Sequence, residues 1–367
     1  MKRLLCIVGG MNAGGAETFL MKIYRALDKS KYQMDFAVGI KEEAVYDSEI
    51  IKMGGIIHRV TPKSEGFFKN FNSIKKIVKE NGYKSVLRIS QHSLSALELL
   101  AAKMGGAKTL AFRSSSSNTL GATKKSRLLH KLFMFLPKFI ANVKIAPSTE
   151  AGVFMFGKRA LKKGKVIILN NGLDLDTIKY DAVSRGEVRK EFNISDDTVL
   201  VGHVGRFAYE KNHNHLINVF SEIKKITPNS KLALVGCGEK ESEIKSQISK
   251  LELDDSVVLT GVRRDVARLF SAMDVFVFPS FYEGMPNTVI EAQATGLPCL
   301  VSDSVTKECK ITDIVEFISL NCSAKEWAEK SLSLLSNERR DTRVDFINNH
   351  YDIESVANKF VEIIFSA

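Results

Sequence analysis

Two glutamates, Glu283 and Glu291, stand in a stretch whose pattern favours phosphate binding, FPSFYEGMPNTVIEAQATGLPCLVSD (residues 278–303). An apolar strand leads into a loop, and a short helix over Asn287–Thr295 follows, introduced by a proline and stopped by a glycine. The start of a helix offers backbone N–H groups and a positive dipole end, which suit a diphosphate. Two isolated glutamates are most often solvated surface groups. The prediction of a phosphate site therefore depends on the surrounding Gly-Met-Pro-Asn-Thr loop.

A second cluster, VGHVGRFAYEKNH (residues 201–213), places Arg206 and Lys211 in the loop after another expected strand. A guanidinium fork and an ammonium group at a strand end form a natural clamp for a diphosphate. They would neutralise a leaving nucleoside diphosphate without a metal ion, although such loop charges are more often simply solvated. His213 and His215 are expected to have a capping or surface role rather than to bind a metal.

A third cluster is the glycine-rich turn GGMNAGGAETF (residues 9–19) between the first strand and the first helix. Gly14 and Gly15 would let the backbone approach a ligand closely. The spacing differs from the dinucleotide fingerprint G-x-G-x-x-G, so by itself the turn is a weak signal. Glu17 could simply favour the start of its helix.

Short apolar runs alternate with amphipathic helical stretches along the chain, which is typical of parallel α/β sheets. Ligands of such sheets bind beyond the carboxyl ends of the strands, so the site is expected in those loops, facing a cleft between domains. The expected strands are Leu4–Val8, Met34–Val38, Ile56–Val60, Ser85–Ile89, Thr109–Phe112, Lys144–Ala146, Val166–Leu169, Val199–Val204, Lys231–Val235, Ser256–Leu259, Val275–Phe278 and Pro298–Val301.

The length of 367 residues exceeds a usual single domain and predicts two. We expect an N-terminal domain over residues 1–175, a second over 190–350 and a closing helix over 351–367. The connection contains Asp174-Leu175-Asp176, a D-x-D string that binds a metal in another class of transferase. The string is common by chance, and no metal site is predicted here.

The composition, with 44% hydrophobic and 26% charged residues, is that of an ordinary globular protein. The net charge of +11 could favour binding to nucleic acid, anionic lipid or phosphorylated substrates. No helix-turn-helix, zinc-finger or RNP signature accompanies it, so nucleic acid is the weaker choice. Phosphate-bearing substrates at an anionic membrane face are favoured.

The first apolar run, about six residues, is too short for a signal peptide or a membrane span. The five cysteines contain no C-x-x-C pair, which predicts reduced thiols and no structural zinc. A cytoplasmic protein is therefore expected, associated with the inner face of the plasma membrane if it binds membranes at all.

Together the three clusters resemble the family-four retaining glycosyltransferases, or glycosyl transferases group 1. The likeness is most specific where EGMPNTVIEAQATGLP follows GRFAYEKNH, and it includes the GGAE turn and the NGLD segment at residues 171–174. The nearest subgroup is that of bacterial capsule and exopolysaccharide transferases. The resemblance implies the GT-B fold, in which two Rossmann-like, doubly wound domains face each other across a cleft. It also implies metal-independent, retaining hexosyl transfer from a nucleotide sugar, expected to be UDP-linked, to a saccharide acceptor that a lipid can carry.

The resemblance assigns roles residue by residue. Arg206 and Lys211 would hold the diphosphate, and Glu283 would lie beside the transferred sugar. Glu291 would hydrogen-bond the ribose hydroxyls. The other expected donor contacts, near the phosphates, the sugar or the nucleotide, are Gly14, Gly15, Gly284, Met285, Asn287, Thr288, Gly236, Gly238, Glu239, Val262 and Arg263. No cofactor is expected besides the donor substrate.

One departure from the family concerns the acceptor side. Many relatives carry histidines after the strand that corresponds to Thr109–Phe112, whereas this chain has Arg113 and a run of serines. His92, after an earlier strand, could take part of that role, and a structural imidazole is an equal alternative. In a retaining transfer the leaving phosphate can itself accept the acceptor's proton.

Two apolar and basic stretches, Lys124–Lys144 and Gly66–Phe71, could lie on an anionic bilayer. Packing of a helix in the core is an equal alternative for the first. Two other functions remain open, a GT-B-like sugar-nucleotide epimerase and a basic binding protein without catalysis. Nucleotide release from a donor would depend on an acceptor for a transferase and would not depend on one for an epimerase. It would be absent for a non-catalytic binding protein.

Overall fold

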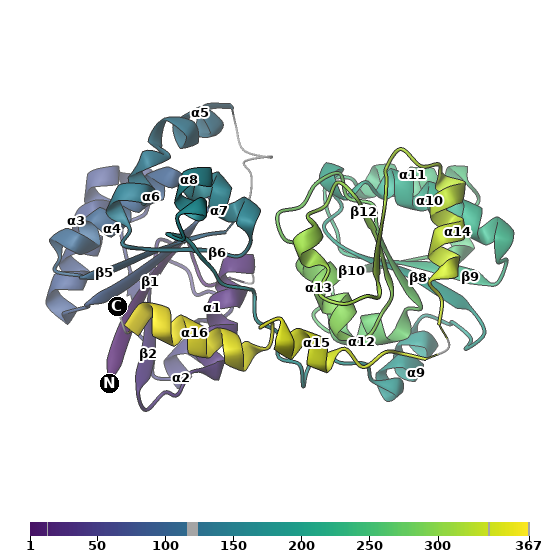
Figure 1. Ribbon diagram of the computed structural model, residues 1–367, viewed down its shortest axis with the longest axis horizontal. Helices are drawn as coiled ribbons and strands as arrows, with labels where there is room; N and C mark the ends of the chain where they lie inside the picture. Colours follow the sequence, from purple (N-terminus) through teal and green to yellow (C-terminus); the bar gives the residue numbers. More distant parts are fainter. Residues whose placement is uncertain (13, 116–123, 337, 366–367) are drawn as a thin grey trace. The chain divides into compact units, whose positions relative to one another are not determined.

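The computed structural model of the protein describes residues 1–12, 14–115, 124–336 and 338–365. The chain divides into two compact units, unit 1 with Met1–Gly172 and His350–Ala367 and unit 2 with Leu173–Asn349 (Figure 1). Each unit is built on one sheet whose neighbouring strands all run parallel. The predicted fold class, two doubly wound α/β domains, is confirmed.

The sheet of unit 1 has seven strands in the order β3-β2-β1-β4-β5-β6-β7. The order reverses between β1 and β4, and ligands of doubly wound sheets bind at this switch point. The strands are β1 Lys2–Val8, β2 Tyr32–Val38, β3 Ile57–Arg59, β4 Ser85–Ser90, β5 Thr109–Ser114, β6 Val143–Ala146 and β7 Ile167–Ile168.

Helices cover both faces of this sheet. Residues of α1, α2 and α16 form a core with one face, whereas residues of α3, α4 and α7 form a core with the other. The helices are α1 Gly15–Ala26, α2 Asp47–Lys52, α3 Phe67–Asn81, α4 Ala96–Met104, α5 Lys124–Phe133, α6 Phe135–Ile140, α7 Thr149–Phe156, α8 Lys158–Lys162 and α16 Ile353–Phe365, with short 3-10 turns at Lys63–Glu65 and Ser93–Ser95.

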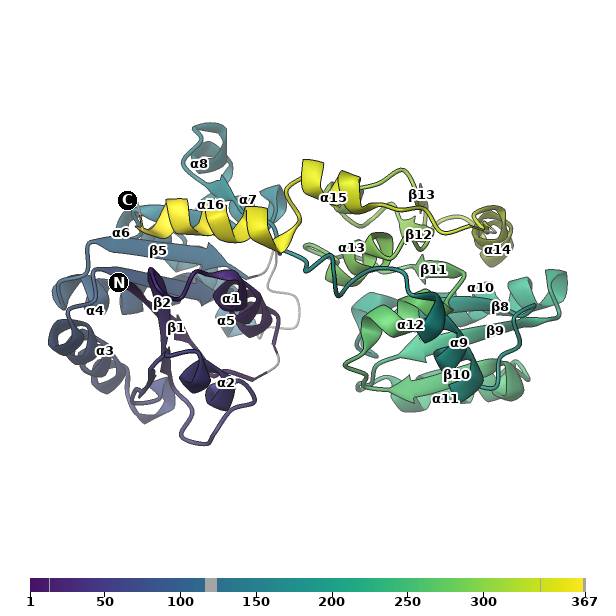
Figure 2. The ribbon, with the colours of Figure 1, turned by 90° about the horizontal axis from the view of Figure 1, so that it is seen from below.

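The C-terminal helix α16 returns from unit 2 to pack on α1 and the sheet of unit 1 (Figure 2). Phe360 meets Phe19 edge to face, with ring centroids 6.4 Å apart. Lys2 Nζ donates to the carbonyl oxygen of Phe365 at 2.7 Å. The segment predicted as a separate closing helix is therefore part of the first unit.

Unit 2 has six strands in the order β10-β9-β8-β11-β12-β13, with the switch point between β8 and β11. The last strand is absent from the sequence prediction because its run is short and carries a glutamate in the middle. The strands are β8 Val199–Val204, β9 Ser230–Val235, β10 Val257–Gly261, β11 Val275–Phe278, β12 Cys299–Ser302 and β13 Val315–Ile318.

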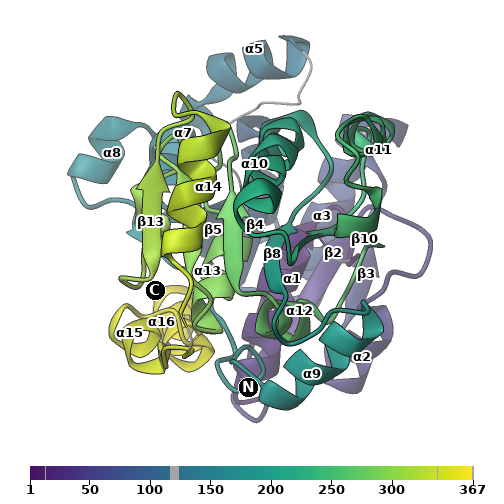
Figure 3. The ribbon, with the colours of Figure 1, turned by 90° about the vertical axis from the view of Figure 1, so that its right-hand side faces the viewer.

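Helices α10, α11 and α14 cover one face of the second sheet, where they form its main apolar core (Figure 3). Helices α12 and α13 lie on the other side (Figure 1). The helices are α9 Ala182–Glu191, α10 His213–Ile226, α11 Glu241–Lys250, α12 Val266–Ala272, α13 Asn287–Ala294, α14 Ala324–Ser333 and α15 Arg343–Asn348, with short 3-10 turns at Tyr209–Lys211, Asp254–Ser256 and Lys307–Cys309.

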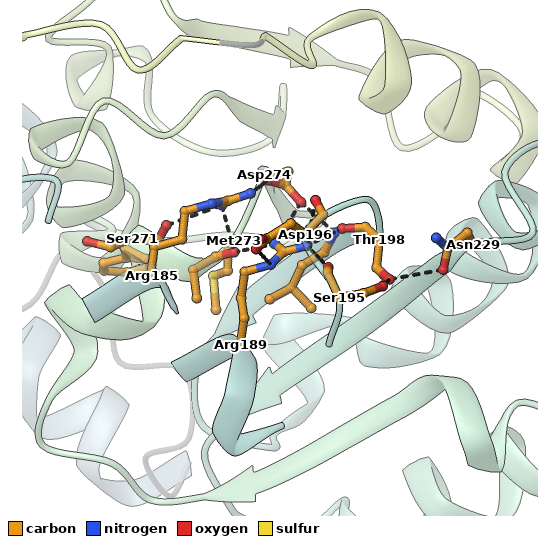
Figure 4. A network of polar contacts seen from close by, with 12 residues as sticks. Arg185, Arg189, Ser195, Asp196, Thr198, Asn229, Ser271, Met273 and Asp274 are labelled. Carbon is orange, nitrogen blue, oxygen red and sulfur yellow. Dashed lines mark hydrogen bonds and ion pairs between the residues drawn. The ribbon is translucent and has the colours of Figure 1, made fainter. Parts of the chain in front are cut away.

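Arg189 fastens α9, which lies outside both predicted domains, to the amino ends of β8 and β11 (Figure 4). Its guanidinium group is 1% exposed and donates to the carbonyl oxygen of Ala272 at 2.9 Å. It also reaches Asp274 Oδ2 at 3.3 Å, an atom that accepts from the backbone N–H of Leu200 at 2.7 Å. This network fixes the amino edge of the sheet and leaves the carboxyl edge for ligands.

Candidate active site

The loops after β8 and β11 meet at the switch point of unit 2 because backbone and side-chain hydrogen bonds join them. The N–H of Phe281 donates to the carbonyl oxygen of Glu210 at 2.9 Å. Asn212 Nδ2 donates to the carbonyl oxygen of Pro279 at 3.1 Å. The two segments that the sequence treats as separate clusters are thus one structural element.

Lys211 and Glu283 form an ion pair across these two loops. The distance from Lys211 Nζ to Glu283 Oε1 is 2.6 Å, and the side chains are 13% and 17% exposed. The ammonium group also lies 4.6 Å from the centroid of the Phe278 ring, within the range of a cation–π contact. Opposite charges attract more strongly where water is largely excluded. The structure therefore places a concentrated pair of charges at the switch point.

Two neutral histidines lie buried behind this ion pair. His203 is 0% exposed and His213 is 3% exposed. Burial holds the pKa of His203 well below its usual value and lowers the pKa of His213 to about 4. His203 Nδ1 lies 2.9 Å from the carbonyl oxygen of Val277, so this nitrogen carries the proton of the neutral ring. Neither ring adds charge to the site near pH 7.

The expected capping or surface role is wrong for His213. Asn212 occupies the N-cap position of α10, and the His213 ring packs edge-on against Phe207 at a centroid distance of 4.8 Å. His215 is partly buried and packs edge-on against Trp327 at 5.2 Å. The sequence offered no signal for this burial because polar residues surround both histidines along the chain.

Arg206 is the exposed cation of the site. Its side chain is 65% exposed, and the guanidinium group donates to Glu210 Oε1 at 2.8 Å. The hydrogen bond from Arg206 to Glu210 raises the pKa of the arginine. An exposed pair of this kind contributes only about 0–1 kcal/mol, so a diphosphate can replace the glutamate at little cost.

The start of α13 faces the same loops. Pro286 is its N-cap residue and makes no side-chain capping bond, so the amides of the first turn have no cap from that residue. Asn287 and Glu291 are four residues apart and share one side of the helix. The predicted contacts Gly284, Met285 and Thr288 belong to the same short stretch. A helix N-terminus of this kind attracts anions.

Glycines allow the loops after β8 and β9 to touch. A Cβ atom at Gly236 would lie 2.1 Å from the carbonyl oxygen of Gly205, and one at Gly238 would lie 2.4 Å from that of Phe207. Gly236 also has a φ of 139°, a conformation that favours glycine. These two positions therefore maintain the shape of the loops, and Glu239 follows them as an exposed residue.

The turn after β10 presents Val262, which is 72% exposed. Arg263, in contrast, is held by Asp265 and Glu191, and its hydrogen bonds to these carboxylates raise its pKa. The predicted nucleotide contact at this turn thus has the Val262 side chain and the backbone available, whereas the Arg263 side chain already has partners.

Taken together, the carboxyl edge of unit 2 brings Arg206, Lys211, the carboxylates that pair with them and a helix N-terminus to the switch point. Two cations and oriented amides stabilise a diphosphate, whether bound or leaving. A carboxylate among them can face the positive charge that develops on a sugar when its bond to phosphate breaks. Such an arrangement can support transfer of a group from a phosphate-bearing donor.

Comparisons with known proteins agree with that chemistry. The sequence profile described as glycosyl transferases group 1 matches residues 184–352. EpsF of Bacillus subtilis (strain 168), which is named as a glycosyltransferase, is 33% identical over 331 residues, covering 89% of this chain and 86% of its own. The chain belongs to the glycosyl transferases group 1 family. The predicted family is confirmed.

Two further similarities extend over the whole transferase. An α-1,4-N-acetyl-D-galactosaminyltransferase of Campylobacter jejuni, whose name includes a PP-undecaprenol saccharide, is 24% identical and covers 99% of this chain and 98% of its own. The crystal structure of HepE of Anabaena in complex with UDP-glucose has a TM-score of 0.77 at 17% identity, with 100% of both chains covered. At that identity the structural likeness shows the fold alone, and it agrees with the predicted GT-B type.

The glycine-rich turn of the transferase leads into α1 of unit 1. Gly14 is the N-cap residue and makes no side-chain capping bond, and α1 begins at Gly15. A Cβ atom at Gly14 would lie 2.4 Å from Glu17 Oε2, so the carboxylate lies directly against the start of the helix. Burial raises the pKa of Glu17. The start of α1 thus has an acid of its own where the sequence predicts phosphate or sugar.

Arg113 is the penultimate residue of β5 and is buried in unit 1. The side chain is 2% exposed, and its guanidinium carbon lies 3.7 Å from the centroid of the Phe19 ring. It donates to Asn171 Oδ1 at 2.6 Å. In the part of the chain that the structure describes, no carboxylate lies within ion-pair distance of Arg113. Burial lowers the pKa of the guanidinium group to about 9.

A buried charge cluster that the sequence did not reveal lies beside His92. Arg88 Nε lies 2.5 Å from Glu98 Oε2, and Lys63 Nζ lies 3.0 Å from the same oxygen. Burial, together with the charges of Lys63 and Arg88, lowers the pKa of His92. His92 is half-buried after β4, and its backbone N–H donates to Ser90 Oγ at 3.1 Å. The candidate acceptor residue is thus a neutral imidazole.

The D-x-D string has local partners. Asp174 Oδ1 accepts from the backbone N–H of Asp176 at 3.0 Å, which closes a turn. Asp176 forms an ion pair with Arg343 at 2.8 Å. Both carboxylates therefore hold the polar connection that begins unit 2.

Proposed function

We propose that this transferase moves a hexosyl residue, with retention, from a UDP-sugar to a saccharide acceptor during assembly of a cell-surface polysaccharide. The observation that carries the proposal is the Lys211–Glu283 ion pair beside the uncapped start of α13. The UDP-glucose in the complex of HepE and the PP-undecaprenol saccharide in the name of the Campylobacter relative support this choice of substrates.

The ion pair matches the charges of the reaction. Without donor, Lys211 and Glu283 neutralise each other. When the donor is bound, its diphosphate pairs with Lys211 and Arg206, and the sugar carbon that becomes positive faces Glu283. The bond between that carbon and the phosphate oxygen breaks as the acceptor oxygen bonds to the same face. The leaving phosphate accepts the acceptor's proton, so the step requires neither a separate base nor a metal.

Nucleotide release tests this proposal. Candidate donors are first ranked by the rise in unfolding temperature that they produce, because a ligand that binds only the folded state stabilises it. Acceptors are then screened by mass spectrometry for a mass increase of one sugar. We expect UDP release that depends on acceptor and persists in EDTA. Release without acceptor would indicate an epimerase or hydrolase, and binding without release would indicate a non-catalytic protein.

We further propose that the acceptor is lipid-linked and that α5 and α6 of unit 1 contact an anionic membrane. These helices carry four exposed apolar side chains at helical spacing, Leu128, Leu132, Phe135 and Phe139, exposed by 59%, 59%, 48% and 83%. The opposite side packs inward, where His130 stacks on Phe154 at a centroid distance of 4.3 Å. The run predicted to bind a membrane or to pack in the core thus has one face suited to each role.

Charge complementarity supports an anionic lipid surface. Residues 99–149 include nine lysines and arginines and no aspartate or glutamate. Phe68, in α3, belongs to the second stretch predicted to contact a membrane, and its side chain is 78% exposed. Among the helices that the structure describes, none is long and apolar enough to span a bilayer. A cationic helix face with exposed aromatic and leucine side chains binds at the lipid interface.

Vesicle sedimentation tests the membrane contact. The double substitution Leu132→Glu and Phe139→Glu should abolish sedimentation with phosphatidylglycerol vesicles, while the unmodified protein sediments with them at low salt. The matched control Ile226→Glu and Val344→Glu changes two residues of unit 2 that are 49% and 66% exposed. Equal loss in the control, or equal binding to phosphatidylcholine, would contradict the proposed contact.

A further inference from the structure

A pocket of about 190 Å³ lies on the α10–α11 side of the active-site loops. Its walls come from the loops after β8, β9 and β11 and from the first turns of α10 and α11. None of its lining residues belongs to the donor contacts implied by the family resemblance. The residues that carry the argument are Tyr209, Phe281, His213, Asn214, Lys240 and Glu243.

One wall of the pocket is an aromatic platform. Tyr209 is 64% exposed and stacks on Phe281, with ring centroids 5.0 Å apart and an angle of 27° between the planes. An exposed stacked ring offers a flat, rigid apolar face and, for tyrosine, a polar tip. The C–H face of a pyranose ring is a flat apolar surface of similar size. The platform therefore favours a sugar.

The opposite rim of the pocket is polar. Asn214 Nδ2 donates to Glu243 Oε1 at 2.8 Å, and Lys240 Nζ donates to Glu243 Oε2 at 2.6 Å. The side chains of Lys240 and Glu243 are 39% and 48% exposed, and each retains further hydrogen-bonding capacity. Their charges cancel. A neutral ligand with several hydroxyl groups fits this rim better than a phosphate does.

A buried imidazole without partners forms part of the wall. His213 is 3% exposed, and neither ring nitrogen has a hydrogen-bond partner among the described residues. The low pKa of His213 keeps the ring neutral, so it offers one donor and one acceptor. Both nitrogens are shielded from solvent, and the ring packs against Phe207, so His213 gives this wall an uncharged surface.

The size of the pocket limits the ligand to one sugar ring. Pockets for drug-sized ligands are larger, roughly 300–1,000 Å³. A single pyranose ring fits, and the rest of a saccharide chain would extend into solvent.

We propose that this pocket is a subsite for one neutral sugar ring of the saccharide acceptor. The proposal rests on the proposed function and adds a place where the transferase recognises its acceptor. The pocket shares its walls with the active-site loops, because Tyr209 is two residues before Lys211 and Phe281 is two residues before Glu283. A chain held there would be anchored close to the reacting centre.

Saturation-transfer NMR on the whole chain tests the subsite. The probes are glucose, galactose, N-acetylglucosamine and N-acetylgalactosamine at millimolar concentration, each with saturating UDP. We expect transfer to the ring C–H protons of at least one sugar. Tyr209→Ala should reduce it roughly three- to tenfold, the scale of an aromatic contact. Tyr209→Phe keeps the platform and should restore it, and Val344→Ala, at a residue of unit 2 that is 66% exposed, is the matched control.

UDP calorimetry on the same samples separates the two proposals. If UDP does not bind, the proposed function fails. If UDP binds but no sugar shows transfer, or if transfer persists in Tyr209→Ala, the subsite is wrong and the proposed function stands. Persistent transfer would place the sugar beside Glu283 instead.

Discussion

The carboxyl edges of the two sheets hold their charges in different ways. In unit 2, Arg206 is 65% exposed and Lys211 is 13% exposed, and each pairs with one glutamate. In unit 1, Arg88 and Glu98 form a pair that is only 10% and 7% exposed, and Lys63, which is 46% exposed, shares the same carboxylate. Groups that border solvent can exchange a partner for a ligand, whereas buried pairs cannot do so without a large desolvation penalty. The first arrangement suits an anionic ligand, whereas in the second the buried Glu98 carboxylate is already neutralised by two cations.

The N-termini of α13 in unit 2 and α1 in unit 1 also differ in how well they can accept an anion. The start of α13 has a proline at its N-cap and no side-chain capping bond. At the start of α1, the Glu17 carboxylate lies against Gly14. An anion is therefore attracted to α13, whereas at α1 it would meet a carboxyl group. Similar Rossmann-like architecture thus gives two edges with different chemistry.

Two buried arginines sharpen this comparison. Arg189 of unit 2 and Arg113 of unit 1 are 1% and 2% exposed. Arg189→Met removes one of the two arginine partners of Asp274 and the hydrogen-bond donor to several carbonyl groups, and it should destabilise unit 2 by about 3–5 kcal/mol. Arg113→Met removes a cation without a described carboxylate partner and should change stability by less than about 1.5 kcal/mol, since only one hydrogen bond and one ring contact are lost.

Chemical unfolding combined with hydrogen exchange measures both changes, because a chain of two units need not unfold in one step. Exchange should accelerate in α9 and β8 for Arg189→Met alone. Equal destabilisation by the two substitutions would show that Arg113 stabilises unit 1 by more than its one hydrogen bond and one ring contact explain.

Glu283→Gln tests the role of the carboxylate in unit 2. The amide keeps the shape of the side chain and removes the charge that faces the developing positive centre. An interaction that strengthens in the transition state should appear in kcat, and losing one such group reduces the rate on the order of a hundredfold or more. UDP affinity should change little. Near-native turnover with donor and acceptor would remove Glu283 from the mechanism.

Glu291→Ala should fail in binding rather than in rate. Ribose hydroxyls are bound in the ground state and the transition state alike, so the substitution should weaken UDP affinity by roughly 1.5–3 kcal/mol. Calorimetry with UDP measures this change, and Glu291→Gln indicates how much of it depends on charge. Unchanged affinity in Glu291→Ala would exclude a ribose contact.

The sequence predicted the fold well because apolar periodicity is a local property. Strands with long apolar runs, such as Val199–Val204, agree with the structure, whereas β13 was missed. The loops after β8 and β11 were identified from residue types together with the family resemblance. Their contact through Lys211 and Glu283 depends on strand order, which local patterns do not contain.

The features that could not be predicted are contacts between distant residues. Nothing near Glu98 in the sequence shows that Arg88 and Lys63 converge on its carboxylate. The burial of His213 likewise depends on packing against Phe207 and the His203 ring. Charged and polar residues look solvated in sequence, and only the tertiary structure shows which of them lose water.

The most direct test of the central claim, that the edge of unit 2 holds the donor diphosphate without a metal, is UDP calorimetry in EDTA on a matched pair of lysines. Lys211 pairs with Glu283 in unit 2, and Lys63 pairs with Glu98 in unit 1. We expect the unmodified protein to bind UDP in EDTA. Lys211→Ala should lose roughly 1.5–3 kcal/mol of binding free energy, while Lys63→Ala binds as the unmodified protein does. Binding that requires manganese, or equal loss in both variants, would contradict the account.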